Sequence, residues 1–276
     1  MEPEIRNPEP GTQKLMPVFQ QIAETIRTEK LTGDIFRFTV KAPDMAAAAK
    51  PGQFVMVRPG EGLDPLLRRP FSIHQVADGG LLQILFKVIG KGTQALAGLQ
   101  PGQYMDILGP LGRGFEYTAG HLHYLVGGGI GIAPLLFLAK QLLKKNNPSA
   151  IRVLLGARTG AEIAMLLEDF KAMGLAAEAV TEDGSLGQKG LATDLMTPLH
   201  DEHPAMVYAC GPYPMLRAVV GLSRNRGWVC QISLETIMAC GLAACLGCAV
   251  QRADLNGYVH VCKDGPVFNA DEVAWL

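Results

Sequence analysis

Four of the six cysteines stand near the C-terminus at a spacing that suits a metal cluster. Cys240, Cys245 and Cys248 form a C-x4-C-x2-C run, and Cys262 follows after thirteen intervening residues. This is the plant-type arrangement for a [2Fe–2S] cluster, which needs four soft, anionic thiolates around two irons. The small residues between the cysteines would let backbone N–H groups approach the bridging sulfides. We therefore predict that a tight loop supplies three ligands and a distant strand the fourth.

Two other interpretations of these cysteines stay open, namely a structural zinc site and buried, inert thiols. Zinc sites usually pair their cysteines as two short knuckles, and a four-residue arm filled with glycine and alanine fits that pattern poorly. A disulfide framework is not expected, because the chain is long and its polar, proline-rich N-terminus lacks the apolar core of a secretory signal. We expect a reducing, cytoplasmic location.

A second motif, RRPFS at residues 68–72, opens a predicted strand. A flavin needs a flat wall, a cation for its pyrophosphate and a small hydrogen-bonding group near N5. Arg69, Phe71 and Ser72 could supply these together, although an arginine at the edge of a strand is more often simply solvated. Further along, KVIGKGT at residues 87–93 opens a predicted helix. Gly92 and Thr93 would form a phosphate cradle there, or Thr93 would be an ordinary N-cap.

Two further motifs follow predicted strands in the second half of the chain. GGGIGIAP at residues 127–134 overlaps the dinucleotide-binding fingerprint in position, because glycine lets a backbone approach a diphosphate closely. The alternative is a tight turn that needs glycine for its own geometry. CGPYPM at residues 210–215 places a thiol and small residues at the carboxyl end of a strand, where ligands bind in parallel sheets. Cys210 could equally be a small core residue.

The predicted secondary structure that must position these motifs differs between the two halves of the chain. Glycine- and proline-bounded strands predict an antiparallel sandwich or barrel, with one short helix at 93–99. These strands are expected at 35–40, 53–57, 71–76, 81–88 and 103–108. Beyond residue 120, strands alternate with helices, which predicts a parallel sheet. The strands are expected at 123–126, 151–155, 177–181 and 206–210, and the helices at 134–145, 163–173, 192–196 and 214–226.

The predicted organisation is a β + α/β protein. It comprises a flexible extension (1–16), an antiparallel β-barrel (17–118), a parallel-sheet α/β domain (119–234) and a C-terminal segment (235–276) with the cysteine loop and a hairpin of 249–251 with 258–261.

Composition excludes several classes of function. The 276 residues carry a net charge of -1, so no basic field would hold nucleic acid or an anionic membrane. Hydrophobic residues make up 48%, which excludes a largely disordered chain. The uncharged stretch 124–139 is shorter than the ~18–20 residues of a membrane span. The histidines share no spacing, so we predict no acid–base catalytic residue and expect loop or surface positions for His74, His121, His123, His200, His203 and His260.

In this order, RRPFS, GKGT, GGGIGIAP and CGPYPM resemble the flavin and nicotinamide motifs of the ferredoxin-NADP reductase superfamily. With the loop CGLAACLGC and Cys262, residues 17–262 are most similar to electron-transfer subunits of NAD-dependent dihydroorotate dehydrogenase. The resemblance implies FAD bound by Arg69, Pro70, Phe71, Ser72, Phe86, Lys87, Val88, Gly92 and Thr93. It implies NAD bound by Gly128, Gly129, Gly131, Pro134, Cys210, Gly211 and Pro212. It also implies a [2Fe–2S] cluster on the four cysteines.

The resemblance further implies a partner, an FMN-containing catalytic subunit that oxidises dihydroorotate, in a heterotetramer with two copies of each subunit. Electrons would pass through the cluster and FAD to NAD+ in pyrimidine biosynthesis. Two alternatives remain, a reductase subunit of a ferredoxin-dependent transhydrogenase, sulfide dehydrogenase or hydrogenase, and a zinc-stabilised binding protein. The loop departs from the family pattern at Ala243, where a second glycine is usual, so a different loop backbone is possible.

Overall fold

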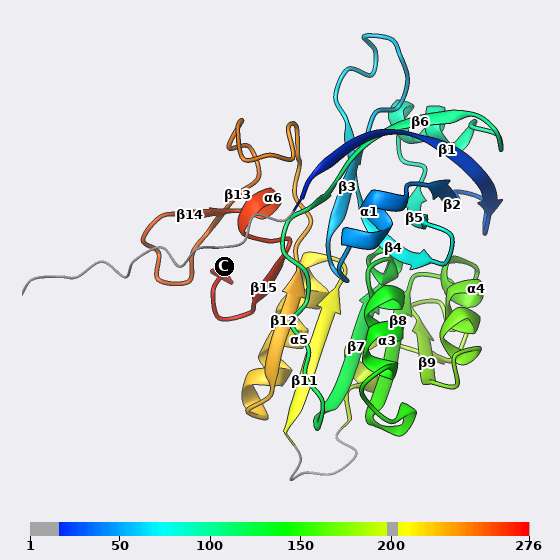
Figure 1. The fold of residues 1–276 in the computed structure, drawn as a ribbon. Coiled ribbons are helices and arrows are strands. Elements are labelled where there is room, and N and C mark those ends of the chain that lie inside the picture. The colour runs from blue at the N-terminus through cyan, green and yellow to red at the C-terminus, as the bar shows by residue number, and fades with distance from the viewer. Residues whose placement is uncertain (1–16, 198–203, 276) are drawn as a thin grey trace, which may run out of the picture.

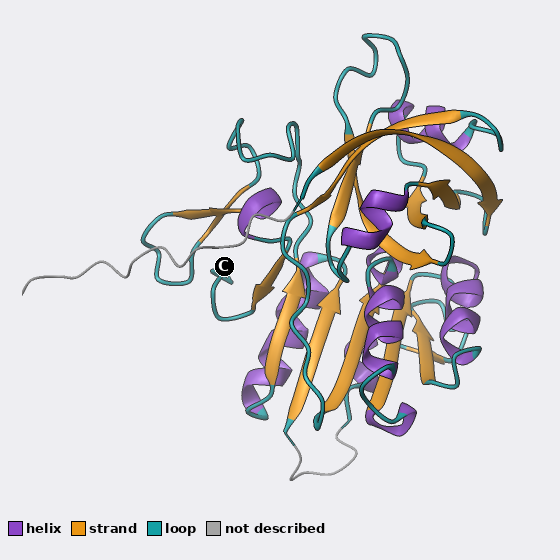
Figure 2. Cartoon of the chain, viewed as in Figure 1, coloured by secondary structure: helices purple, strands orange, loops and turns teal. Residues whose placement is uncertain are grey.

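The computed structural model describes residues 17–197 and 204–275, so the predicted extension 1–16, His200 and His203 lie outside the described residues. A barrel stands above the carboxyl ends of a mostly parallel sheet, and the C-terminal segment lies against the side of both (Figure 1). Helices cover the sheet on its two faces (Figure 2). The predicted fold class is therefore confirmed.

Six antiparallel strands close the barrel in the order β1-β2-β5-β4-β3-β6. They are β1 (Phe19–Lys30), β2 (Ile35–Lys41), β3 (Phe54–Val57), β4 (Arg69–Ala77), β5 (Leu81–Lys87) and β6 (Tyr104–Leu111). Two short helices, α1 (Pro43–Ala48) and α2 (Lys91–Ala97), cap it, so the prediction of a single helix was wrong. Strand β1 was not predicted, because its Gln, Glu, Thr and Arg side chains leave it half exposed and without an apolar run.

Seven strands form the second sheet in the order β10-β9-β8-β7-β11-β12-β15, and only β15 is antiparallel. They are β7 (Leu122–Gly128), β8 (Ile151–Ala157), β9 (Ala176–Thr181), β10 (Gln188–Lys189), β11 (Ala205–Cys210), β12 (Val229–Ser233) and β15 (Val267–Asn269). The helices are α3 (Leu135–Leu143), α4 (Gly160–Lys171) and α5 (Tyr213–Asn225), with short 3-10 turns at Gly129–Ile132, Pro148–Ala150 and Ala192–Leu195. Cys210 pairs with Gly127, so the two predicted nucleotide motifs leave the sheet side by side.

The C-terminal segment is tied into the nucleotide sheet. The hairpin of β13 (Ala249–Gln251) and β14 (Tyr258–His260) projects to one side, and α6 (Val261–Asp264) follows it directly. Cys262 therefore lies in a short helix, and the prediction of a strand ligand was wrong. β15 then returns to pair with β12, which anchors the segment at the edge of the sheet.

Two histidines are placed differently from the prediction of loop or surface positions. His74 in β4 and His123 in β7 are buried, with 1% and 0% exposure. No helix in the described part of the chain is long and apolar enough to cross a membrane.

Candidate redox centre

Two cavities meet where the barrel, the sheet and the C-terminal segment come together. The first, about 350 Å³, runs along β4 and β5 and is closed by residues 233–236 and 238, at and just after the end of β12; we call it the flavin recess. The second, about 450 Å³, lies over the carboxyl ends of β7, β8 and β11; we call it the nucleotide cleft. Lys87 and Ile130 line both cavities, so a ligand in one would lie next to a ligand in the other.

The flavin recess collects most of the residues predicted to bind FAD. Phe71 packs against Phe86 with ring centroids 5.2 Å apart, which gives the wall a rigid aromatic backing. Val88 and Gly92 do not line the recess, whereas seven other predicted residues do. These are Arg69, Pro70, Phe71, Ser72, Phe86, Lys87 and Thr93.

Arg69 is the cation of the recess, and Gly92 makes room for it. The Arg69 guanidinium donates to the carbonyl of Leu67 at 2.8 Å, and within the described residues no carboxylate pairs with it. A Cβ at position 92 would lie 2.8 Å from Arg69 Nε, so glycine lets the guanidinium lie close against the backbone there. Its neighbour Arg68 is instead paired with Asp106 at 2.6 Å. The charge of Arg69 is thus left for an anionic ligand, as the pyrophosphate of FAD requires.

Thr93 does not cap α2 in the predicted way. The helix starts from Gly90, and the Thr93 hydroxyl accepts hydrogen bonds from the N–H groups of Ile89 (2.9 Å) and Gly90 (3.2 Å). Thr236 also lines the recess, and its hydroxyl is buried without a partner among the described residues. An orphaned hydroxyl in an apolar recess fits the polar edge of a flavin ring, which sequence reasoning had no signal to find.

The ammonium of Lys87, a predicted FAD ligand, is held by carboxylates. Its Nζ donates to Glu162 Oε1 at 2.9 Å and lies 3.3 Å from Asp34 Oδ2. The hydrogen bond to Glu162 raises the pKa of Lys87, so it stays charged. Because Glu162 belongs to α4, this ion pair joins the barrel to the sheet domain between the two cavities.

In the nucleotide cleft, Gly128, Gly129 and Pro212 line the cavity. Gly131, Pro134, Cys210 and Gly211 lie outside the lining. Gly131 is a packing residue, because a Cβ there would come within 2.5 Å of the Cys210 carbonyl oxygen. The Cys210 thiol is buried, and burial raises its pKa, so the thiol is neutral at pH 7.

The cleft also contains charged residues that sequence reasoning missed. Arg158 follows β8 and Glu182 follows β9, and both line the cavity. Acidic residues at the carboxyl ends of parallel strands bind ribose hydroxyls in dinucleotide sites. The predicted strand at 177–181 followed directly by Glu182 was the signal that could have found it.

The four cluster cysteines fall into two pairs. The Sγ atoms of Cys248 and Cys262 are 3.3 Å apart, and the N–H groups of Leu242 and Cys245 each lie 3.4 Å from Cys240 Sγ. Burial raises the pKa of Cys240, but the hydrogen bonds from these N–H groups outweigh it and lower the pKa to about 6, which favours the thiolate. Among the described residues, no group of three or more His, Cys, Asp or Glu side chains is arranged around a single metal ion. Two pairs of cysteines suit a cluster in which each iron takes two sulfur ligands.

The backbone of residues 240–248, the cluster loop, is shaped to present N–H groups to sulfur. Gly241, Ala243 and Leu246 have φ values of 72°, 57° and 59°. Gly241 also packs against the barrel, since a Cβ there would lie 2.6 Å from Met56 Cγ in β3. The loop is therefore preformed, and its donors fit an iron–sulfur cluster.

Three family models match successive parts of the chain. They are an oxidoreductase FAD-binding domain over residues 24–117, an oxidoreductase NAD-binding domain over 125–221, and the iron-sulfur cluster binding domain of dihydroorotate dehydrogenase B over 235–274. The chain thus carries domains for FAD, NAD and an iron–sulfur cluster.

Proteins similar over most of the chain are named "Dihydroorotate dehydrogenase B (NAD(+)), electron transfer subunit". The protein of Desulforamulus reducens is 43% identical over 85% of this chain and 90% of its own length. That of Fusobacterium nucleatum is 38% identical over 88% of this chain and 94% of its own length. A solved chain of an NADH-dependent reduced ferredoxin-NADP oxidoreductase matches with a TM-score of 0.82 and 33% identity, covering 92% of this chain and 90% of that one. With identities of this size over nearly its whole length, the chain belongs to the family of dihydroorotate dehydrogenase B electron transfer subunits.

Proposed function

We propose that this chain carries electrons from an FMN-containing catalytic subunit, which oxidises dihydroorotate, through a [2Fe–2S] cluster and FAD to NAD+ in pyrimidine biosynthesis. One observation carries the proposal, namely that the three sites adjoin in this order. Met238 lines the flavin recess, and Cys240 begins the cluster loop two residues later. Ile130 and Lys87 line both the recess and the nucleotide cleft.

The residues of the chain hold and orient the cofactors and do little proton chemistry. Arg69 would bind the FAD pyrophosphate, while Pro70 and Phe71 form the flat wall and Ser72 offers a hydroxyl. Gly128 and Gly129 would admit the nicotinamide nucleotide beside that wall. Cys240, Cys245, Cys248 and Cys262 would ligate the cluster. When bound, FAD supplies the conversion between two-electron hydride chemistry and one-electron transfer to the cluster.

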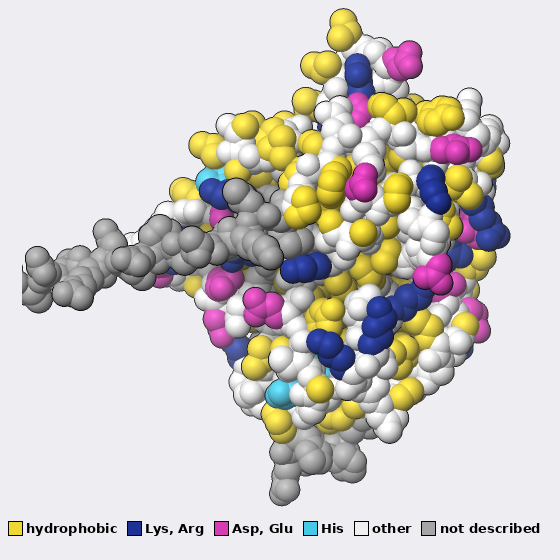
Figure 3. All heavy atoms as spheres, in the orientation of Figure 1, with side chains coloured by type: hydrophobic (Ala, Val, Ile, Leu, Met, Phe, Trp, Pro, Cys, Tyr) yellow, Lys and Arg dark blue, Asp and Glu magenta, His cyan; other side chains and the backbone are white. Residues whose placement is uncertain are grey.

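The chemistry of the cluster loop supports a partner subunit on its outer side. Leu242 and Leu246 are 54% and 56% exposed, and Ile237 just before the loop is 89% exposed. Figure 3 shows hydrophobic side chains gathered over this part of the molecule. An apolar rim around a redox centre is suited to a second protein, and short distances favour electron transfer there. We propose that the FMN-containing subunit sits on it, in a heterotetramer of two copies of each.

A charge placed in this rim tests the proposal. Leu246→Glu should weaken co-purification with the catalytic subunit and reduce dihydroorotate–NAD turnover, while NADH still reduces the chain's own FAD. Met165→Glu is the matched control, since Met165 is also exposed (47%) but lies on α4, away from the loop. Normal assembly and turnover of the Leu246 variant would place the partner elsewhere.

The main alternative is a reductase subunit of a ferredoxin-dependent transhydrogenase, and the 33% identical oxidoreductase chain is the observation in its favour. Isolation of the native partner distinguishes the two, because only a dihydroorotate-oxidising partner carries FMN and reduces NAD+ with dihydroorotate. A colourless chain that contains zinc would contradict both redox functions.

The proposal extends to location and to domain boundaries. All six cysteines are free, which suits a reducing cytoplasm. We divide the chain into an FAD-binding unit (17–118), an NAD-binding unit (119–234) and a cluster-binding unit (235–276). The three family matches within these ranges support this division.

A further inference from the structure

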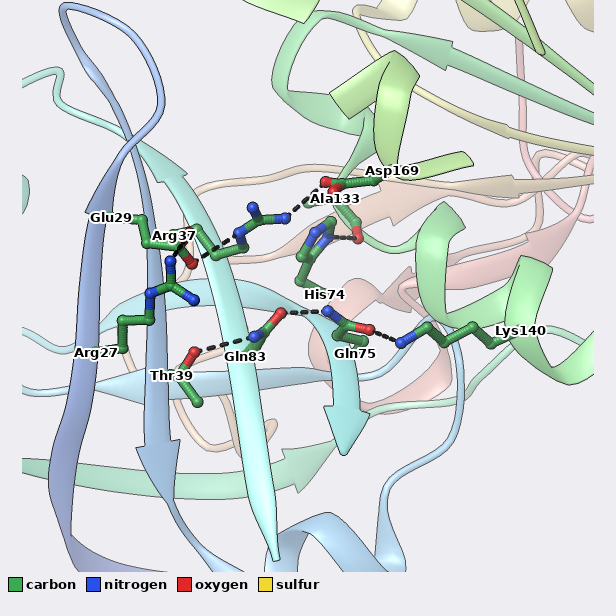
Figure 4. A network of polar contacts seen from close by, with 10 residues as sticks. All are labelled: Arg27, Glu29, Arg37, Thr39, His74, Gln75, Gln83, Ala133, Lys140 and Asp169. Carbon is green, nitrogen blue, oxygen red and sulfur yellow. Dashed lines mark hydrogen bonds and ion pairs between the residues drawn. The ribbon is translucent and has the colours of Figure 1, made fainter. Parts of the chain in front are cut away.

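One buried histidine joins the flavin strand to the nucleotide turn. His74 lies in β4, two residues after Ser72 of the flavin recess, and is 1% exposed. Its Nδ1 lies 2.8 Å from the carbonyl oxygen of Ala133, at the end of the turn between β7 and α3 (Figure 4). The barrel and the sheet domain are thus in direct polar contact beside both cavities.

The geometry fixes the tautomer of His74. A carbonyl oxygen only accepts hydrogen bonds, so Nδ1 must carry the proton and donate it to Ala133. Burial, together with the nearby charges of Arg37 and Lys140, lowers the pKa of His74 to about 4, although the hydrogen bond to Ala133 raises it. The ring is therefore neutral at pH 7, and its Nε2 is buried without a partner among the described residues. Burying Nε2 without a hydrogen bond costs free energy. That the ring is kept there points to a structural role for the hydrogen bond that its Nδ1–H makes.

Ala133, which accepts this hydrogen bond, connects His74 to both cavities. It lines the flavin recess, and its N–H donates to the Ile130 carbonyl at 3.0 Å, which closes the turn. The turn begins with Gly128 and Gly129, which line the nucleotide cleft. One hydrogen bond therefore ties the strand that forms the flavin wall to the turn that borders the nucleotide.

Other polar contacts between the two domains, such as the Lys87–Glu162 ion pair, do not involve the residues of this turn. Arg37 of β2 pairs with Asp169 of α4 at 2.6 Å, and Lys140 of α3 donates to Gln75 (Figure 4). These contacts hold α3 and α4 against the barrel, but they do not touch the turn. Of the polar contacts among the described residues, the His74 hydrogen bond is the one that joins the barrel to this turn.

We propose that His74 is a positioning residue, which holds the nucleotide turn at the separation from the flavin strand that hydride transfer requires. Transfer needs the reacting atoms about 3–3.5 Å apart, and a displacement near 1 Å costs roughly a hundredfold in rate. The inference rests on the proposed function, because it assumes that nicotinamide and flavin meet between the two cavities.

Two variants separate the hydrogen bond from simple packing. His74→Asn keeps an N–H donor near the position of Nδ1, whereas His74→Leu fills similar space without a donor. We expect His74→Leu to slow FAD reduction at saturating NADH by at least ~tenfold, with FAD content kept and the nicotinamide–flavin charge-transfer absorption weakened. His74→Asn should stay within about threefold of the wild-type rate.

Asp169→Asn is the control, since it removes an interdomain ion pair that does not reach the turn. It should lower thermal stability and leave the saturating rate unchanged. A wild-type rate in His74→Leu overturns the proposal, as do equal losses in the Leu and Asn variants.

A second measurement does not depend on electron transfer. Hydrogen exchange of the amides in residues 128–133 of the FAD-loaded protein should be at least ~tenfold faster in His74→Leu than in wild type, and close to wild type in His74→Asn. If His74→Leu does not fold, His74→Gln, which offers its donor at the wrong position, takes its place. If wild-type protein fails to reduce FAD with NADH, the proposed function fails. The exchange rates then decide the His74 inference alone, and unchanged exchange contradicts it.

Discussion

Ala243 donates its backbone N–H to the Sγ of Cys262 across 3.1 Å, and it does so with a φ of 57°. Left-handed backbone costs a residue with a Cβ about 1–2 kcal/mol. Ala243 thus adopts a backbone conformation that glycine takes more readily. This conformational cost falls at the residue whose N–H bonds to Cys262, a predicted cluster ligand.

Ala243→Gly should consequently stabilise the protein by about 0.5–1 kcal/mol, after allowing for the extra freedom of glycine in the unfolded chain. Cluster absorbance should decay more slowly on dilution into chelator. Leu255→Gly relieves a similar φ of 60° in the hairpin turn, outside the cluster loop, and should leave cluster decay unchanged. Faster loss of the cluster from the Ala243 variant would contradict this account.

Cys245→Ser should lose or destabilise the [2Fe–2S] signal, because a serine hydroxyl is neither soft nor anionic at pH 7. NADH reduction of FAD should largely survive, since the flavin and nucleotide residues lie elsewhere. Cys230→Ser is the control, because Cys230 is buried in β12 outside the cysteine spacing. The ligand assignment does not stand if cluster absorbance is fully retained in the Cys245 variant.

Arg69→Ala should weaken FAD binding about ten- to a hundredfold, because a charge-assisted hydrogen bond to phosphate contributes about 1.5–3 kcal/mol. Equilibrium dialysis of released flavin measures it. Arg68→Ala removes a neighbouring guanidinium that is engaged with Asp106 and should change FAD affinity much less. Equal effects of the two variants would show that general charge, and not a specific contact, holds the cofactor.

Glu182→Gln should reduce the preference for NADH over NADPH by roughly tenfold, because the carboxylate in the cleft repels a 2′-phosphate and accepts from a 2′-hydroxyl. The ratio of second-order rate constants for FAD reduction by the two nucleotides reports it. Asp183→Asn is the control, since the Asp183 carboxylate accepts from Ser185 and does not line the cleft. An unchanged ratio in the Glu182 variant removes this residue from nucleotide selection.

The free energy of unfolding should decrease as the pH is lowered below 6.5, the ordinary pKa of histidine. Burial lowers the pKa of His74 from 6.5 to about 4 in the folded protein, so the unfolded chain binds a proton in this window that the folded chain does not. The free energy of unfolding then decreases by up to about 1.4 kcal/mol for each unit that the pH falls. Burial lowers the pKa of His123 as well, which adds in the same direction.

Denaturant unfolding of His74→Asn at several pH values between 4 and 6.5 tests this contribution. The variant should lose much of the pH slope, with the remainder arising from His123 and other groups. An identical slope in wild type and variant would show that His74 takes up no proton on unfolding in this range.

Short motifs and the alternation of strands and helices were enough to predict the class of fold and to name candidate cofactor-binding residues. RRPFS, GGGIGIAP and the cysteine run are contiguous, so their chemistry depends on spacing that the sequence states directly. Strand β1 was missed because a strand half exposed on a barrel carries no apolar run. Cys262 was placed on a strand because spacing gives the order of ligands and not the backbone that carries them.

The sequence by itself determined which residues could bind FAD, NAD and the cluster, since these depend on local residue types. Only the tertiary structure decided which of them face a common cavity, because that depends on where distant segments return. Gly92 packs against Arg69, Lys87 pairs with Glu162, and His74 is hydrogen-bonded to Ala133. In each case the two residues are far apart in sequence, and no local pattern encodes the contact. A polar side chain costs free energy when it is buried unless its partner is present, and folding alone brings that partner to it.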